Sequence, residues 1–212
     1  MASGILTKTA IIIVVCMACL PSLSNADQPV DVLKKSIDQS IRILNDPIYN
    51  DPHQRTIQRQ ALWQILKQLF DFEEFSRRVL ARGWHKFTSQ QQTEFVGLFG
   101  NFVHIYYLSK LQEKYNNEQI TYLDQNLVSD SKAVVNIEVI WKYKNIPVEV
   151  RMIKRGDSWK VYDLAALGVS AVSFYRSQFR AVLQNESPGQ VLDILKGKIK
   201  KSEEKVQQKY SQ

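Results

Sequence analysis

The sequence predicts an α+β fold with an antiparallel sheet of about four to five strands and about six to seven helices. Up to residue 115, apolar residues recur at spacings of three and four, which is typical of amphipathic helices. From residue 119 to residue 163 they alternate with polar residues, which indicates strands with one buried face. A helical period returns after residue 168. This order of helices, hairpin-linked strands and helices indicates a single α+β domain.

Residues 1–26 form a predicted secretory signal peptide. Lys8 supplies the positive charge, residues 10–20 form the apolar run, and Ser24-Asn25-Ala26 offers small residues for cleavage before Asp27. A membrane anchor is the alternative, but the apolar run is shorter than the roughly 20 residues that cross a bilayer. We therefore expect an exported chain whose mature form begins at Asp27.

The mature chain carries no cysteine, because Cys16 and Cys19 both lie in the predicted signal peptide. It therefore offers no thiol for a disulfide, a nucleophile or a metal site. Lipidation of Cys19 stays open as an alternative to cleavage. Loss of Lys8 lowers the formal net charge from +7 to +6. An anionic membrane, an acidic partner or plain solubility would each explain this excess, whereas nucleic acid is not expected for an exported chain without a recognition motif.

Four helices are expected ahead of the strands, over residues 30–45, 52–69, 71–80 and 89–115. Pro52 suits the first turn of the second helix, and Asp71 can cap the third. Ser89 and Gln92 form a capping box for the fourth. The fourth helix is apolar around most of its circumference, so other elements must cover it on several sides.

Four strands are expected to follow, over residues 119–128, 133–143, 146–154 and 159–163. Lys144-Asn145 is the expected turn between the second and third strands. Two helices close the chain, over residues 169–184 and 187–200. The domain is therefore expected to span residues 27–200, and residues 201–212 form a charged tail that frays or is disordered.

The stretch Trp159–Phe179 indicates a strand, a turn and a helix. Gly168 breaks the strand pattern, and Ser170 can cap the helix that follows. A structural ion pair between Asp163 and Arg176 is expected at this corner. The spacing of the stretch is W-x-V-Y-D-x(4)-G-V-S-x-V-x(2)-Y-R-x(2)-F. Its motif residues are Trp159, Asp163, Gly168, Ser170, Tyr175, Arg176 and Phe179.

This pattern resembles the MlaC family, also called the toluene-tolerance family, whose members are periplasmic phospholipid carriers. Leu167 departs from the pattern, since an acidic or polar residue is expected there. The resemblance implies a curled sheet whose helices hold open an apolar cavity, an arrangement that is NTF2-like in part. It also implies a phospholipid ligand and two partners that together maintain outer-membrane lipid asymmetry. These partners are an outer-membrane lipoprotein–porin complex and an inner-membrane ABC transporter complex with its lipid-binding subunit.

On that resemblance, the acyl chains are expected between the long helix and the inner face of the sheet, with Val169 and Val172 near the mouth. The expected lining residues are Phe95, Phe99, Phe102, Tyr106, Ile137, Val139, Trp141, Val148, Val150, Met152, Val169 and Val172. Composition alone favours a filled core. A ligand-free periplasmic interaction module therefore stays open, as does a carrier of another lipid such as a hopanoid.

Nothing in the sequence indicates catalysis. Gly168-Val169-Ser170 lacks the second glycine of a nucleophile elbow, and no glycine-rich phosphate-binding motif occurs. No metal-binding spacing links the three histidines, His53, His85 and His104. We therefore expect a binding protein that uses neither metal nor cofactor.

Overall fold

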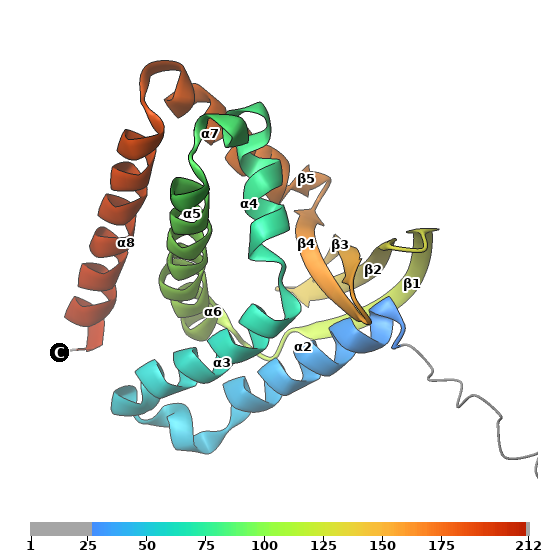
Figure 1. The fold of residues 1–212 in the computed structure, drawn as a ribbon. Coiled ribbons are helices and arrows are strands. Elements are labelled where there is room, and N and C mark those ends of the chain that lie inside the picture. Colours follow the sequence, from blue (N-terminus) through green and yellow to red (C-terminus); the bar gives the residue numbers. More distant parts are fainter. Residues whose placement is uncertain (1–26, 211–212) are drawn as a thin grey trace, which may run out of the picture.

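The computed structural model describes residues 27–210, in which helices lie beside and below one curved antiparallel sheet (Figure 1). The expected α+β class is confirmed. The predicted signal peptide lies outside the described residues. The helices are α2 (Pro29–Asn45), α3 (Arg55–Leu69), α4 (Phe72–Leu80), α5 (Ser89–Phe102), α6 (Leu108–Lys114), α7 (Ala171–Asn185) and α8 (Pro188–Tyr210). The strands are β1 (Gln119–Ser129), β2 (Lys132–Trp141), β3 (Lys144–Arg155), β4 (Ser158–Ala166) and β5 (Val169–Ser170).

The expected long helix consists of α5 and α6, joined by a π-helical turn over Val103–Tyr107. Its capping box lies one residue earlier than expected. Thr88 Oγ1 accepts from Gln91 N (3.2 Å), and Gln91 Oε1 accepts from Thr88 N (3.0 Å). Thr88 is the last residue with extended backbone, so its side chain meets the free amides of the first turn. Gln92 donates instead to the carbonyl of Trp84 (3.0 Å).

The sheet is a meander with the order β1-β2-β3-β4-β5, and every neighbouring pair is antiparallel. In the central hairpin Trp141 pairs with Lys144, which leaves Lys142 and Tyr143 as the turn. The turn expected at Lys144-Asn145 therefore lies two residues earlier. The buried faces of the two strands fix this register, because a slip of one residue would turn every apolar side chain outward.

One core lies on the inner face of the sheet, against the start of α2. Alternate residues of β2, β3 and β4 point into it, as expected for strands with one buried face. The buried residues of this sheet core are Leu33, Ala133, Val135, Ile137, Val150, Met152, Trp159 and Val161.

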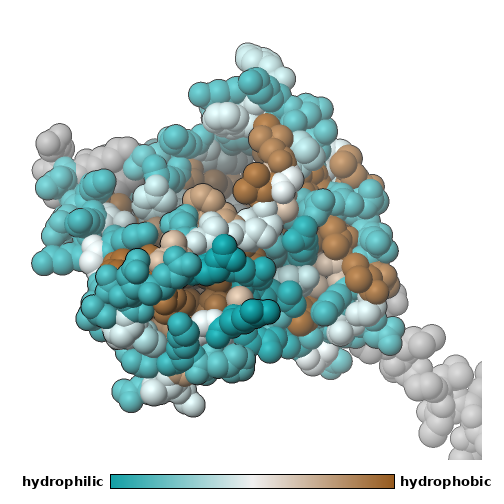
Figure 2. Space-filling model, turned by 90° about the horizontal axis from the view of Figure 1, so that it is seen from above, coloured by the Kyte–Doolittle hydropathy of each residue, from teal (hydrophilic) through white to brown (hydrophobic). Residues whose placement is uncertain are grey.

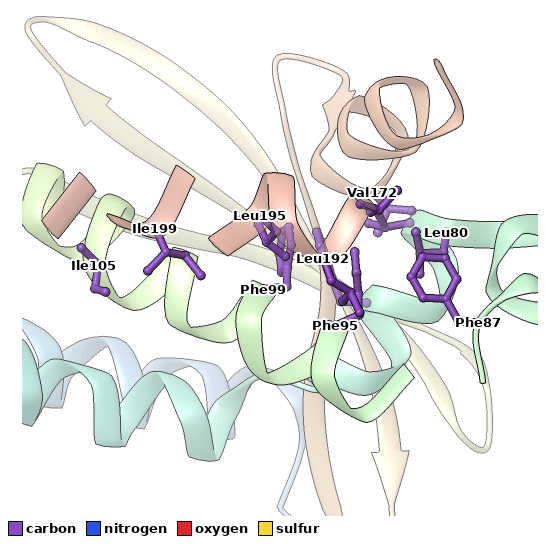
Figure 3. Packing of buried hydrophobic residues seen from close by; sticks show 12 residues of the cluster. Leu80, Phe87, Phe95, Phe99, Ile105, Val172, Leu192, Leu195 and Ile199 are labelled. Carbon is purple, nitrogen blue, oxygen red and sulfur yellow. The ribbon is translucent and has the colours of Figure 1, made fainter. Parts of the chain in front are cut away.

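A second core, the helical core, lies among α4, α5, α7 and α8. In Figure 3, Phe99 of α5 lies beside Leu195 of α8, and other labelled side chains of the two helices meet in the same way. α8 continues as a helix beyond residue 200, where a fraying or disordered tail was expected, and Val206 still packs on this core. α8 stays helical there because the long helix is apolar around most of its circumference, and α8 packs along it and shields this surface from water.

Asp71 ties the helices to the sheet. As expected it caps α4, since its Oδ1 accepts from Glu74 N (2.8 Å). Its own amide donates to Val161 O (2.8 Å), and its Oδ2 accepts from Arg155 Nε (2.7 Å). Arg155 also donates to Glu74 Oε2 (3.0 Å), so the end of β3 is fixed to the start of α4.

Candidate functional site

A cavity of about 690 Å³ lies between the sheet and the helices α2, α3 and α6. α2 begins against the sheet, where Leu33 is buried and Val30 N donates to Gln125 Oε1 (3.1 Å). It then runs away from the sheet along α3 (Figure 1), so its later apolar residues face the cavity. The lining residues are Ser36, Ile37, Ser40, Ile41, Leu44, Leu62, Ile65, Leu66, Leu69, Leu108, Leu111, Lys114, Tyr115, Glu118, Ile120, Val139, Trp141, Ile146, Val148 and Leu167.

The inner wall of this cavity is apolar in composition, and its two serine hydroxyls donate to their own helix rather than to the cavity. Two serines lie on the α2 side, but each hydroxyl donates to its own helix: Ser36 Oγ to Val32 O (2.9 Å) and Ser40 Oγ to Ser36 O (2.9 Å). Their donor hydrogens are therefore used within the helix. The inner wall offers a ligand mainly van der Waals contact and exclusion of water.

The exposed lining residues mark the mouth of the cavity, which we define as Leu111, Lys114, Trp141 and Leu167. Leu167 is 66% exposed and Trp141 is 42% exposed. A polar recess of about 370 Å³ adjoins the mouth and shares Lys114 and Trp141 with it. The site thus has an apolar interior and a polar entrance that carries both Lys114 and Glu118.

A buried polar network fixes the helical wall. Gln58 Nε2 donates to Ile43 O (2.9 Å), and Gln112 Nε2 donates to Gln58 Oε1 (2.8 Å). Arg59 Nη1 donates to Ser109 Oγ (3.3 Å). These bonds join α2, α3 and α6, and a connected buried network favours one arrangement of the elements it links.

His104 lies in the π-helical turn and stacks on Trp63, with ring centroids 5.0 Å apart and planes 18° apart. Desolvation by burial lowers the pKa of His104, and the charge of Arg59 lowers this pKa further. The imidazole is therefore mainly neutral at pH 7. It stabilises the contact between α3 and the long helix by stacking rather than by charge.

The expected lining residues lie in four different environments in the structure. Val139, Trp141 and Val148 line the cavity. The other expected sheet residues, Ile137, Val150 and Met152, are buried in the sheet core. Phe95, Phe99 and Phe102 of the long-helix stripe belong to the helical core, together with Val172. Tyr106, the last residue of that stripe, stacks on Phe102 but is 36% exposed, and Val169 is exposed on β5.

The long-helix stripe lies away from the cavity because α7 and α8 occupy the face it presents. The helical part of the cavity wall comes instead from α2, α3 and α6, on which the sequence predicted no site residue. Their apolar spacing was visible, for example Ile37, Ile41 and Leu44, but spacing cannot distinguish a face that packs from a face that lines a cavity. Contact between any of these residues and a ligand stays a prediction.

The motif from Trp159 to Phe179 builds a buried corner around Asp163, which is 2% exposed. Its Oδ2 accepts from Ser170 Oγ (2.6 Å) and from Arg151 Nη1 (3.0 Å). Its Oδ1 accepts from Val172 N (3.0 Å). Ser170 also caps α7, since its hydroxyl accepts from Ser173 N (3.1 Å). The carboxylate thus joins β3, β4 and β5 to the start of α7.

The expected ion pair between Asp163 and Arg176 does not form. Arg151 pairs with Asp163 because the two lie opposite each other on β3 and β4. Arg176 Nε donates instead to Arg78 O on α4 (2.9 Å).

The remaining motif residues lie in different parts of the fold. Trp159 belongs to the sheet core, and Gly168 takes a positive φ (78°) in the turn before β5. Tyr175 and Phe179 pack on the helical core, where the Tyr175 and Phe99 ring centroids lie 5.1 Å apart.

Within residues 27–210 the structure holds no group of three or more His, Cys, Asp or Glu side chains placed to bind a metal. In the same part of the chain, no helix combines the length and apolar character that crossing a bilayer requires.

Both a protein-family model and a solved structure are similar to this chain. A sequence model of the MlaC protein family matches residues 34–197. Among solved structures, a phospholipid-binding protein from Ralstonia solanacearum in complex with a phospholipid is similar, with a TM-score of 0.68. The two chains are 21% identical, and the match covers 81% of this chain and 96% of that one. The search of the curated proteins found no match.

Proposed function

Since the chain belongs to the MlaC protein family, we propose that it is a periplasmic phospholipid carrier. In this proposal it moves lipid between an outer-membrane lipoprotein–porin complex and an inner-membrane ABC transporter complex, and so maintains outer-membrane lipid asymmetry. The observation that carries the proposal is the apolar cavity of about 690 Å³ between the sheet and α2, α3 and α6. Its volume lies in the upper part of the ~300–1,000 Å³ range of ligand sites.

The physical need for such a cavity follows from the cost of exposing acyl chains to water. Two chains hold about 30 methylenes, each costing roughly 0.8 kcal/mol to expose, or on the order of 20 kcal/mol in total. A cavity wall of aliphatic and aromatic side chains removes this cost without any covalent step. Transfer from bilayer to cavity is then apolar to apolar, so the lipid can be released as well as held.

The polar groups around the cavity support chain binding without a dedicated headgroup site inside. Ser36 and Ser40 donate to α2 itself, whereas Lys114 and the polar recess lie at the mouth. The acyl chains therefore occupy the interior, and the phosphate headgroup stays near Lys114 and solvent. No step in this carrier role requires catalysis, so we propose a binding protein rather than an enzyme.

The test is to purify the chain from the periplasm under native conditions, extract it and identify the lipid by mass spectrometry. The proposal expects phospholipid in a fixed ratio to protein. Recovery of a hopanoid or another lipid would refute phospholipid as the cargo. Recovery of no lipid, together with no uptake from phospholipid vesicles, would refute the carrier function and favour an interaction module.

A further inference from the structure

Two tight turns lie at the same end of the sheet, beside the cavity mouth. Lys142–Tyr143 connects β2 to β3, and Leu167–Gly168 connects β4 to β5. The β3–β4 register places the start of β3 beside the end of β4, and Leu167 N donates to Pro147 O (3.2 Å). Trp141, next to the first turn, and Leu167, within the second, both line the cavity.

These turns use side chains that their backbone disfavours. Lys142, Tyr143 and Leu167 have positive φ values of 48°, 64° and 51°. Two-residue hairpin turns with positive φ strongly favour Asn-Gly or Gly-Gly, because a side chain in this region is strained. Strained residues of this kind cluster at functional sites, so three of them in two neighbouring turns point to a role beyond the fold.

The side chains that the two turns expose are aromatic, aliphatic or basic. Tyr143 is 102% exposed, and Leu167 and Trp141 also reach solvent. Lys142 and Lys144 flank Tyr143, and the Lys142 ammonium lies 4.9 Å from the centre of the Trp141 ring. Figure 2 views the side where α7 and β5 lie in Figure 1, and it shows further apolar patches among hydrophilic residues there.

Trp and Tyr with neighbouring lysines are typical of protein surfaces that lie in the headgroup layer of a membrane. The aromatic rings suit the boundary between acyl chains and water, and the ammonium groups reach anionic phosphates. Glu149 is paired with Arg151 (3.0 Å), whereas Glu138 accepts from the neutral amide of Asn145 (2.8 Å) and keeps its charge. Glu118 also lies nearby, in the polar recess with Lys114 and Lys142. Lys114, Lys142 and Lys144 outnumber Glu118 and Glu138, so the balance of charge at the turns is positive.

We propose that these two turns form a docking surface through which the cavity mouth meets an anionic phospholipid bilayer. The docking surface consists of Trp141, Lys142, Tyr143, Lys144 and Leu167. Its purpose rests on the proposed carrier function, because docking there places the mouth at the lipid surface. Leu167 is 66% exposed at the mouth, and an exposed leucine there suits insertion into the apolar part of a bilayer.

The test is flotation of the mature chain with vesicles of phosphatidylethanolamine and phosphatidylglycerol, and with vesicles of phosphatidylcholine alone. Wild type is expected to float with the anionic vesicles, less with the neutral ones, and less as salt rises. Lys142→Asn combined with Tyr143→Gly restores the favoured turn residues. This variant should bind the anionic vesicles at least about fivefold more weakly, since each lysine at such a surface contributes about that factor. Its Tm should be unchanged or higher, because the strain is relieved.

Leu167→Asn, which also suits positive φ, should weaken vesicle binding in the same direction. The matched control is Val128→Thr combined with Lys132→Ser, which removes an exposed apolar residue and a lysine at the opposite end of the sheet. This control should float like wild type.

Wild type that does not float with anionic vesicles would overturn the docking proposal, as would turn variants that bind as well as wild type. Binding that appears only with a protein partner present would overturn it in favour of a protein interface. Lipid extraction of the same preparation separates the two proposals. A chain that carries phospholipid but never floats refutes docking alone, whereas one that floats but takes up no lipid refutes the carrier function.

Discussion

Narrowing the cavity should weaken lipid binding strongly while leaving the fold intact. Ile41 lies on the α2 wall and Val148 on the sheet wall, so tryptophan at both positions narrows the cavity from two sides. Together the two changes add roughly 150 Å³ of side chain, which is the room of about five methylenes if each occupies as much as a water molecule. The cavity volume is about 690 Å³, so about a fifth of the space is lost.

The expected effect on affinity follows from the methylenes that no longer fit. Five methylenes at about 0.8 kcal/mol each weaken binding by about 4 kcal/mol. That corresponds to about a thousandfold in Kd. Stability should not fall, because each new ring enters space that no protein atom occupies and buries apolar surface there.

The assay measures lipid per protein by mass spectrometry and Tm by calorimetry on the same sample. The matched control is Val150→Trp, two residues along the same strand, because Val150 is 1% exposed in the sheet core. Overpacking there should cost about 1–3 kcal/mol and lower the Tm by roughly 2–12 °C. A double variant that keeps the lipid content and Tm of wild type would refute the cavity as the lipid site. A double variant that unfolds like the control would show that the cavity is not open space.

Three further predictions address the fold and its processing. Asp163→Ala removes an acceptor from Ser170, Val172 and Arg151, so it should cost about 2–3 kcal/mol in urea unfolding. Arg176→Ala should cost under about 1 kcal/mol, and equal costs would contradict the assigned pairing. Because the folded-state pKa of His104 is lowered, its stabilising effect is complete above the unfolded pKa of about 6.5 and is lost as pH falls through the folded pKa. The urea midpoint of wild type should therefore fall between pH 7 and pH 5, and that of His104→Gln should fall less. If the midpoints of the two proteins fall in parallel, His104 is not the source of the pH dependence. Amino-terminal sequencing of the exported chain should begin at Asp27, and a chain that retains Met1 or carries lipid on Cys19 would contradict cleavage.

The sequence by itself determined the elements and their order. Period-two alternation predicted the central hairpin, and the turn moved by only two residues because strand pairing rather than composition sets the register. Local capping was also predictable: Asp71 and Ser170 cap the helices assigned to them, because a cap depends on a few neighbouring amides. The motif spacing predicted the family, and the matching family model confirmed it.

Only the tertiary structure decided where the chain packs and where it leaves space. The stripe of Phe95 and Phe99 has the same spacing as a cavity wall would have, but α8 covers it and makes it a core. α2 meets the sheet at Leu33 and then diverges, so Ile41 and Leu44 line the cavity with an equally ordinary apolar pattern. Hydrophobic periodicity specifies which face avoids water, whereas the distance to the opposite element decides whether that face meets side chains or a cavity.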